Sequence, residues 1–277
     1  LATLTGLPMV EAVLPYLVSD IGAQVAYVYL LTRIVPTVFV LALRDDCIMF
    51  LQKINPPTKV DDIAKPEFIY EAALDEPETA MALTEREQLR IIRYMVDCLE
   101  HSTAEGENGS VKYLESALRS LEDEVKFFIT ELFAQQHTLA TTERLVNIQN
   151  RQKAIVSLHV SIFAICHIIQ DSGNRSSNLT TLASNIKEGL LTILITALEG
   201  AESGDGEDLN LVLQMTEKRT DFLEELRRNC LLGEREIPQD ERAILIDITD
   251  QYQHVVWIIR QWVELLAAYN KGTGSLL

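Results

Sequence analysis

The chain has 277 residues, 47% of them hydrophobic, and a formal net charge of -17. This is enough chain for one large domain or two modest ones. Such an acidic chain lacks the basic surface that a phosphate backbone requires, so we exclude nucleic acid as a partner. It opens at Leu1, in an apolar passage without the pattern of a signal peptide, and we therefore expect it to be a fragment.

Residues 25–43 are nineteen residues long and apolar except for Thr32, Arg33 and Thr37. This length just crosses a bilayer core, so the pattern predicts a membrane helix. An arginine near the middle of a membrane costs about 2.5 kcal/mol or more, so we expect Arg33 to face protein. The span is followed by four basic residues, Arg44, Lys53, Lys59 and Lys65. Positive charge favours the cytoplasmic side, so the rest of the chain is predicted to be cytoplasmic.

A border between apolar and charged sequence lies at residues 54–66. It contains Pro56, Pro57 and Pro66, which remove backbone donors and push the preceding residues out of the helical region. No helix can therefore run through it. We predict the end of a membrane domain at 1–53, a proline-rich connector at 54–74 and a helical domain at 75–277.

Six amphipathic helical patterns follow the connector, and no strand-like alternation competes with them. Asp75 and Ser110 are the expected caps of the first two helices. The connections are short, which favours antiparallel neighbours and an all-α bundle of two three-helix groups. The predicted helices span residues 76–101, 111–132, 142–170, 178–199, 207–231 and 239–269.

The apolar seam of the third predicted helix also holds three polar residues, Gln152, His159 and Cys166. His159 and His167 lie eight residues apart, about two turns, but no acid follows at a matching spacing. We therefore expect hydrogen-bonded core or groove histidines rather than metal ligands. The four cysteines are far apart in the sequence, which favours neither a zinc site nor a disulfide framework and fits a reducing compartment. They are Cys47, Cys98, Cys166 and Cys230.

Two acidic groups could hold a cation. The first is Glu217, Asp221, Glu224 and Glu225, but lysines and arginines are interleaved with it, so a salt-bridged solvent face is the better interpretation. The second is Asp247, Asp250 and His254, for which a solvated helix start is favoured. Asp61 and Asp62 are expected to contribute a helix cap. No phosphate loop, nucleophile elbow or Cys/His pair is visible, so we expect no enzyme activity and assign no catalytic, metal or cofactor residue.

Several segments resemble a known family. The sequences NPPTKVDDIAKP (55–66), IYEAAL (69–74) and PETA (77–80) are similar to the junction of membrane and cytoplasmic parts in bacterial sodium/phosphate cotransporter family proteins. GAQVA (22–26) and the span after it resemble that family's last membrane portion. NIQNRQ (147–152), TEKR (216–219) and Arg227 resemble its C-terminal PhoU-like domain.

The resemblance implies a PhoU-like bundle of six long helices, in two three-helix units, behind a transmembrane segment in the bacterial inner membrane. The expected function is sodium:phosphate symport, regulated by the cytoplasmic bundle. The family's Gln-Ser-Ser motifs do not occur here, so sodium and phosphate would bind upstream of this fragment. Where PhoU proteins carry an acid pair four apart, this chain has SLHV (157–160), so no metal site is carried over. The candidate partners are the membrane, the transporter core and a second copy of the chain.

Two alternatives remain open at this stage. One is a PhoU-type phosphate-signalling adaptor without transport activity. The other is a dimerisation bundle, which the 3.5-residue apolar period of residues 111–132 suggests.

Overall fold

A computed structural model describes residues 29–30, 33–34, 62–103, 108–172, 175–204, 206–217 and 239–273. The chain divides into two units, Leu1–Thr58 and Lys59–Leu277. In the first unit, Tyr29, Leu30, Arg33 and Ile34 are helical and exposed, and the Arg33 guanidinium lies 5.6 Å from the centroid of the Tyr29 ring. The rest of the predicted membrane helix at 25–43 lies outside the described residues, as do Cys47 and residues 54–61 of the connector.

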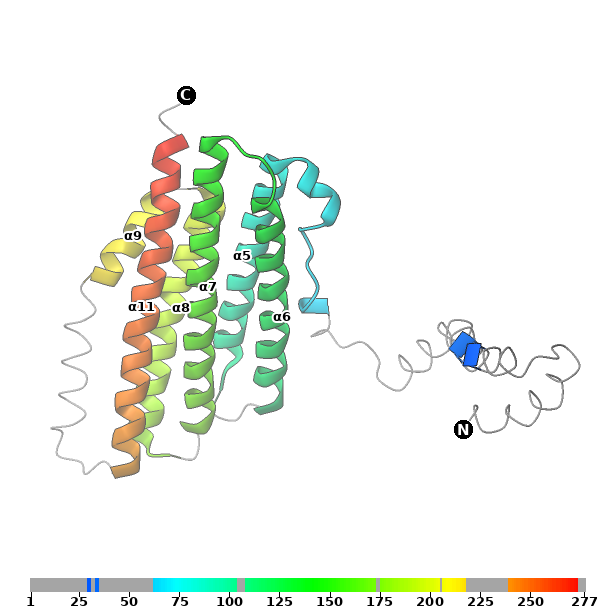
Figure 1. Cartoon of the computed structure of the whole chain (residues 1–277). Helices are drawn as coiled ribbons and strands as arrows, with labels where there is room; N and C mark the ends of the chain where they lie inside the picture. Colours follow the sequence, from blue (N-terminus) through cyan, green and yellow to red (C-terminus); the bar gives the residue numbers. More distant parts are fainter. Residues whose placement is uncertain are drawn as a thin grey trace, which may run out of the picture. The chain divides into compact units, whose positions relative to one another are not determined.

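All the regular secondary structure in the described residues of the second unit is helical, and these residues contain no strand (Figure 1). The all-α prediction is therefore confirmed. A 3-10 helix, η1, lies at the end of the predicted connector and was not expected. The elements are η1 (Glu71–Asp75), α5 (Pro77–His101), α6 (Asn108–Phe133), α7 (Leu139–Asp171), α8 (Ser177–Ser203), α9 (Gly206–Glu217) and α11 (Gln239–Thr273).

N-cap side chains that accept hydrogen bonds from first-turn amides mark the starts of two helices. Thr138 Oγ1 accepts a hydrogen bond from Thr141 N at the start of α7, and Ser176 Oγ accepts one from Leu179 N at the start of α8. The two predicted caps are wrong. Asp75 is the last residue of η1, because the chain makes a 3-10 turn before α5, and Ser110 lies inside α6, which begins two residues earlier.

A glycine separates α8 from α9. Gly204 follows the last residue of α8 with φ +69°, the left-handed conformation that only glycine adopts without strain. The helix predicted at 207–231 is observed from Gly206 to Glu217, and its remainder lies outside the described residues.

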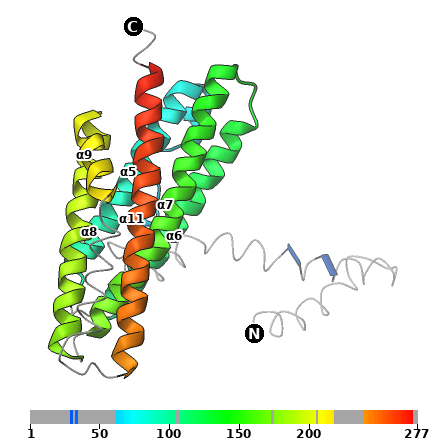
Figure 2. The same cartoon turned by 90° about the vertical axis from the view of Figure 1, so that its left-hand side faces the viewer.

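Helix α7 has neighbours on several sides: α5, α6, α8 and α11 all pack against it (Figures 1 and 2). Helix α5 also contacts α8, while α9 and α11 pack against α8 and each other. One continuous core of apolar side chains joins these helices. It includes Leu118, Leu121, Val125 and Leu132 of the apolar period in α6, so this seam lies inside the bundle and offers no exposed dimerisation surface.

Two helices of the bundle are long and apolar enough to cross a membrane, α7 and the part of α8 from Leu179 to Ser203. About half of each apolar window is buried by neighbouring helices. A core helix of a bundle has the same length and composition, so these two properties alone do not distinguish a core helix from a membrane span.

Burial along α7 gives a direct test of the packing. Ile162 is fully buried, whereas Val160 on the same helix is 59% exposed. We expect Ile162→Ala to lower the free energy of unfolding by about 2–5 kcal/mol, because it leaves a cavity, and Val160→Ala to lower it by no more than about 0.5 kcal/mol. Urea denaturation followed by circular dichroism measures both. Equal effects of the two substitutions would contradict the packing.

Candidate functional site

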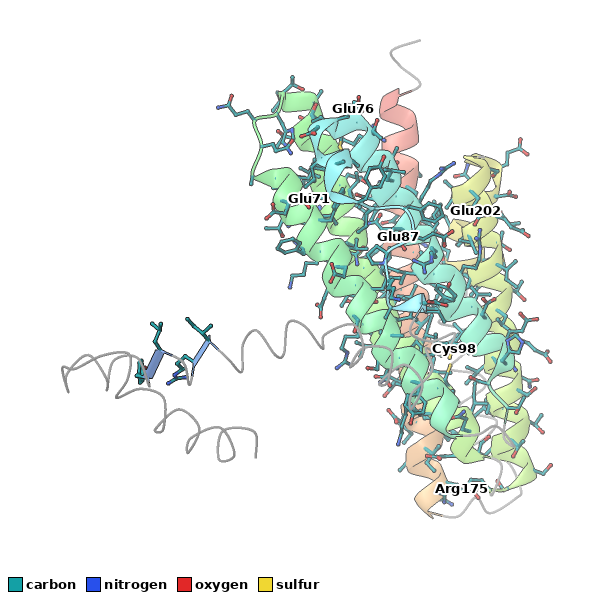
Figure 3. All side chains as sticks on the ribbon, turned by 90° about the vertical axis from the view of Figure 1, so that its right-hand side faces the viewer. Glu71, Glu76, Glu87, Cys98, Arg175 and Glu202 are labelled. Carbon is teal, nitrogen blue, oxygen red and sulfur yellow. The ribbon has the colours of Figure 1, made fainter. Side chains whose placement is uncertain are left out.

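The C-terminal half of the connector is held on α5 by a buried ion pair, which we call the connector clamp. It consists of Glu87 and Arg90 of α5 with connector residues 62–68. The Glu87 carboxylate is fully buried and accepts hydrogen bonds from two connector amides, Glu67 N at 3.0 Å and Phe68 N at 2.7 Å. Glu87 and Arg90 lie three residues apart on one face of α5 and form an ion pair. Figure 3 marks Glu87 on the ribbon.

Arg90 binds the connector from the same side. Its Nη1 donates to Lys65 O at 3.1 Å, and its Nη2 donates to Asp62 O at 3.4 Å. Its Nε lies 3.2 Å from a carboxylate oxygen of Glu67. Burial acts to lower the pKa of Arg90, but hydrogen bonds and charge from Glu87 and Tyr94 outweigh it and raise the pKa. The guanidinium therefore stays charged at every physiological pH.

Further contacts secure the connector before and within η1. The Arg86 guanidinium lies 5.9 Å from the centroid of the Phe68 ring, and Ile69 and Ala73 are buried in the apolar core. Gln135, between α6 and α7, donates to Leu74 O at 2.8 Å. The described part of the connector is thus a packed part of the bundle. Asp62, expected to cap a helix, instead pairs with Lys65 at 3.9 Å and offers its carbonyl to Arg90.

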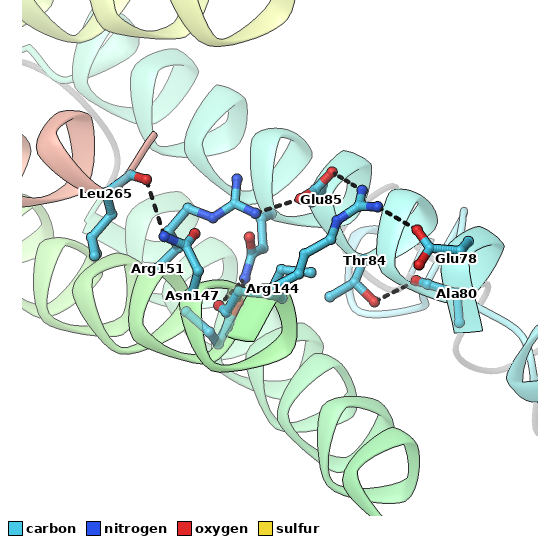
Figure 4. A network of polar contacts seen from close by, with 11 residues as sticks. Glu78, Ala80, Thr84, Glu85, Arg144, Asn147, Arg151 and Leu265 are labelled. Atoms are coloured by element: carbon cyan, nitrogen blue, oxygen red, sulfur yellow. Dashed lines mark hydrogen bonds and ion pairs between the residues drawn. The ribbon is translucent and has the colours of Figure 1, made fainter. Parts of the chain in front are cut away.

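A second polar network lies on another side of the same two turns of α5 (Figure 4). Glu85 and Gln88 are separated from Glu87 by about 100–160° around the helix axis at 100° per residue. Glu85 forms ion pairs with two arginines of α7: Oε1 lies 2.5 Å from Arg151 Nη2, and Oε2 lies 3.2 Å from Arg144 Nη2. Arg144 also reaches Glu78 at 2.7 Å. The Arg151 side chain is only 6% exposed, so Glu85 neutralises a charge inside the bundle.

This network continues from α7 to α11. Gln88 Nε2 donates to Ile148 O at 3.0 Å and to Gln152 Oε1 at 3.2 Å, and Asn147 Nδ2 donates to Leu265 O of α11 at 3.1 Å. Polar contacts therefore join the connector to α5, α5 to α7, and α7 to α11. Sequence reasoning missed these contacts, because their signal is only a set of polar residues at core positions of separate helices.

The polar residues in the seam of α7 each meet a polar partner from another helix. Gln152 meets Gln88, and His159 Nδ1 lies 2.8 Å from Glu122 Oε1 of α6. His159 is 2% exposed, which confirms the prediction of a hydrogen-bonded core histidine. Two turns along, His167 Nε2 lies 3.3 Å from Glu115 of α6. Cys166 lies against Cys98 of α5, with 4.0 Å between the sulfurs.

The second acidic group of the sequence does not form a cluster. Asp247, Asp250 and His254 are exposed on α11, where the His254 ring stacks on Trp257 with 6.0 Å between centroids. His254 and Trp257 border a groove of about 530 Å³ between α7 and α11. Of the first group, Glu217 ends α9 and the other members lie outside the described residues. Among the described residues, no three His, Cys, Asp or Glu side chains are grouped to hold a metal ion.

No protein-family model matches this chain, and neither does any curated protein or solved structure. The clamp contains no nucleophile paired with a base, and its charges are occupied by each other and by backbone groups. What it can do is fix the position of the connector and pass a change in that position to α5.

Removing the Glu87 carboxylate should destabilise the folded bundle. We expect Glu87→Ala to lower the free energy of unfolding by about 3–5 kcal/mol, because it leaves two connector amides without an acceptor and removes the buried carboxylate that pairs with Arg90. Glu87→Gln retains one acceptor oxygen and should cost less. Urea denaturation measures the series, with the exposed Glu71→Ala as control. A loss below about 1 kcal/mol for Glu87→Ala would contradict the clamp.

The shared carboxylate of the second network makes a separate prediction. Glu85→Ala deprives buried Arg151 of its carboxylate, and we expect a loss of about 2 kcal/mol, less than at Glu87 because a fifth of the Glu85 side chain is exposed. Glu78→Ala is the matched control, because that carboxylate is 71% exposed and pairs only with Arg144. It should cost less than about 1 kcal/mol. The same order of stabilities should appear in thermal melts, and the reverse order would refute the network.

Proposed function

We propose that this chain is the C-terminal part of a sodium-dependent phosphate transporter of the bacterial inner membrane. In this proposal residues 1–53 end the membrane domain, which carries sodium and phosphate by symport. Residues 75–277 form a PhoU-like cytoplasmic domain that regulates it. The proposal rests on the family resemblance at residues 55–80, together with the way the connector is attached.

The observation that carries the regulatory role is the connector clamp. A flexible tether needs no fixed contacts with the domain that follows it. Here a fully buried carboxylate and a buried guanidinium form hydrogen bonds with the backbone of residues 62–68. Burying charged groups is unfavourable unless they are fully paired. Glu87 and Arg90 can therefore stay buried only while residues 62–68 remain bound to them. This attachment suits a role in which connector position matters.

The regulatory mechanism we propose is a shift between conformations of the transport domain. The free energy by which the bundle favours one conformation cannot exceed the difference between the free energies of its contacts with the connector in the two conformations. Loss of the clamp in one conformation, and its retention in the other, would provide such a difference. The transporter core and the membrane are then the partners of this chain.

The proposed PhoU-like domain consists of two three-helix units, and the helices of each unit pack against one another, although α7 and α11 of different units also pack extensively within the one core. Helices α5, α6 and α7 all pack against one another, and so do α8, α9 and α11. The residues of the NIQNRQ segment that resemble PhoU-like domains lie on α7, where Asn147, Arg151 and Gln152 bond to other helices. A homodimer is compatible with this division, and the assembly state is part of the proposal.

Phosphate uptake by the complete reading frame tests the proposal. The frame is expressed in bacteria that lack other phosphate transport, and uptake of labelled phosphate is measured in sodium and in potassium medium. We expect uptake that requires sodium, and we expect deletion of residues 75–277 to change its dependence on the cell's phosphate supply. Glu87→Gln should reproduce part of that change, whereas exposed Glu71→Gln should not.

Each part of the proposal has its own contrary result. Absence of sodium-dependent uptake, together with solubility of the chain without detergent, would replace the transporter by a PhoU-type phosphate-signalling adaptor. Sodium-dependent uptake whose regulation is unchanged by the deletion would retain transport and refute the regulatory role of the bundle.

A further inference from the structure

Two free thiols meet in the interior of the bundle. Cys98 lies in the last turn of α5, and Cys166 lies on α7; they are 5% and 0% exposed. Their sulfurs are 4.0 Å apart, which is van der Waals contact. Figure 3 marks Cys98 well along α5 from the clamp. Neither thiol takes part in the connector clamp or the network of Glu85.

The end of α5 around Cys98 is fastened by a lysine from α8. Lys187 Nζ donates to Glu100 O at 2.6 Å and to Ser102 O at 2.8 Å, which satisfies carbonyls at the C-terminus of the helix. Ser102 Oγ donates to Cys98 O at 2.7 Å. Terminal turns of helices open more readily than their centres, so the route by which a solute reaches Cys98 is the opening of this turn. Lys187 binds carbonyls at the end of this turn.

We propose that Cys98 and Cys166 form a reversible disulfide, which joins α5 to α7 when a low-molecular-weight disulfide such as oxidised glutathione is in excess. A disulfide bond is about 2.0 Å long, so the sulfurs must approach by about 2 Å. Both thiols lie on helices that already pack together. Transient disulfides of this kind are compatible with a reducing compartment, where they respond to oxidising conditions.

The reaction proceeds in two exchanges. When the last turn of α5 opens, Cys98 loses its proton to water and attacks one sulfur of oxidised glutathione; the glutathione S–S bond breaks and one glutathione leaves and takes up a proton. The Cys166 thiolate then attacks the Cys98 sulfur, forming the protein disulfide and releasing the second glutathione, which takes up the proton that Cys166 lost. Two protein thiols are oxidised by two electrons, and one glutathione disulfide is reduced to two thiols.

The surroundings of the two thiols shift their pKa values in opposite directions. A hydrogen bond from the Cys98 thiol lowers the pKa of Cys166 against the opposing effect of burial, and the charge of Lys187 acts in the same direction. The hydrogen bond shared with Cys166, together with burial, raises the pKa of Cys98 while the bundle is closed. The hydrogen bond from Cys98 is lost once Cys98 carries glutathione, so the charge of Lys187 is a contribution that still favours the Cys166 thiolate in the second exchange.

Peptide mapping tests the proposal on the full chain, purified reduced in a mild detergent. The protein is incubated with oxidised glutathione, free thiols are blocked by alkylation at low pH, and the digest is analysed by mass spectrometry. We expect a peptide pair joined through Cys98 and Cys166 that dithiothreitol separates. Cys98→Ser and Cys166→Ser should each abolish it, and circular dichroism checks that both variants stay folded.

A rate measurement tests the route of access. In the Cys166→Ser background, where only the first exchange can occur, Lys187→Gln removes the charge that fastens the end of α5, so glutathionylation of Cys98 should become about fivefold faster. Lys153→Gln, at an exposed groove position on α7, is the control and should leave the rate unchanged. The proposal is overturned if the folded wild-type chain keeps both thiols reduced, or carries only glutathione adducts, while the chain in urea reacts. An unchanged rate in Lys187→Gln would overturn the route through the end of α5.

Discussion

A single fully buried carboxylate, that of Glu87, decides where the connector lies. It accepts two connector amides and is neutralised by Arg90, which in turn binds connector carbonyls. Neither charge is stable inside the bundle without the other, and both need the connector backbone to complete their hydrogen bonds. The attachment of the connector and the folding of α5 are therefore coupled: the residues that bind the connector are buried only when it is present.

Helix α7 carries the coupling onward, because it is the helix on which the other long helices converge. Its buried polar residues at seven-residue spacing meet Gln88, Glu122 and Cys98. Buried polar pairs of this kind penalise any shift of register, since a shift leaves polar groups unpaired among apolar side chains. These pairs hold the bundle in one arrangement at several positions along α7. A shift of α5 relative to α7 would therefore break polar contacts at more than one of these positions.

The sequence predicted the all-α class and most helix positions, because helices such as α5 and α6 carry a clear apolar period and the breaks between helices are polar. It also predicted Gln152, His159 and Cys166 as members of the α7 seam. It did not predict their partners, because these lie on other helices at separations of 37 to 68 residues. The clamp was missed for the same reason: Glu87 and Arg90 look like an exposed i,i+3 pair until the connector covers them. The predicted caps at Asp75 and Ser110 were wrong, because a 3-10 turn and two earlier helical residues occupy those positions.

Native-state hydrogen exchange of the Glu67 and Phe68 amides tests the clamp most directly. If Glu87 binds them as part of the folded bundle, both amides should be protected as strongly as the amides of α5 near Arg90 and should open with the same free energy. Exchange of the two connector amides at the rate of an unstructured peptide, while α5 stays protected, would show that the connector is a loose tether and would contradict its coupling to the bundle.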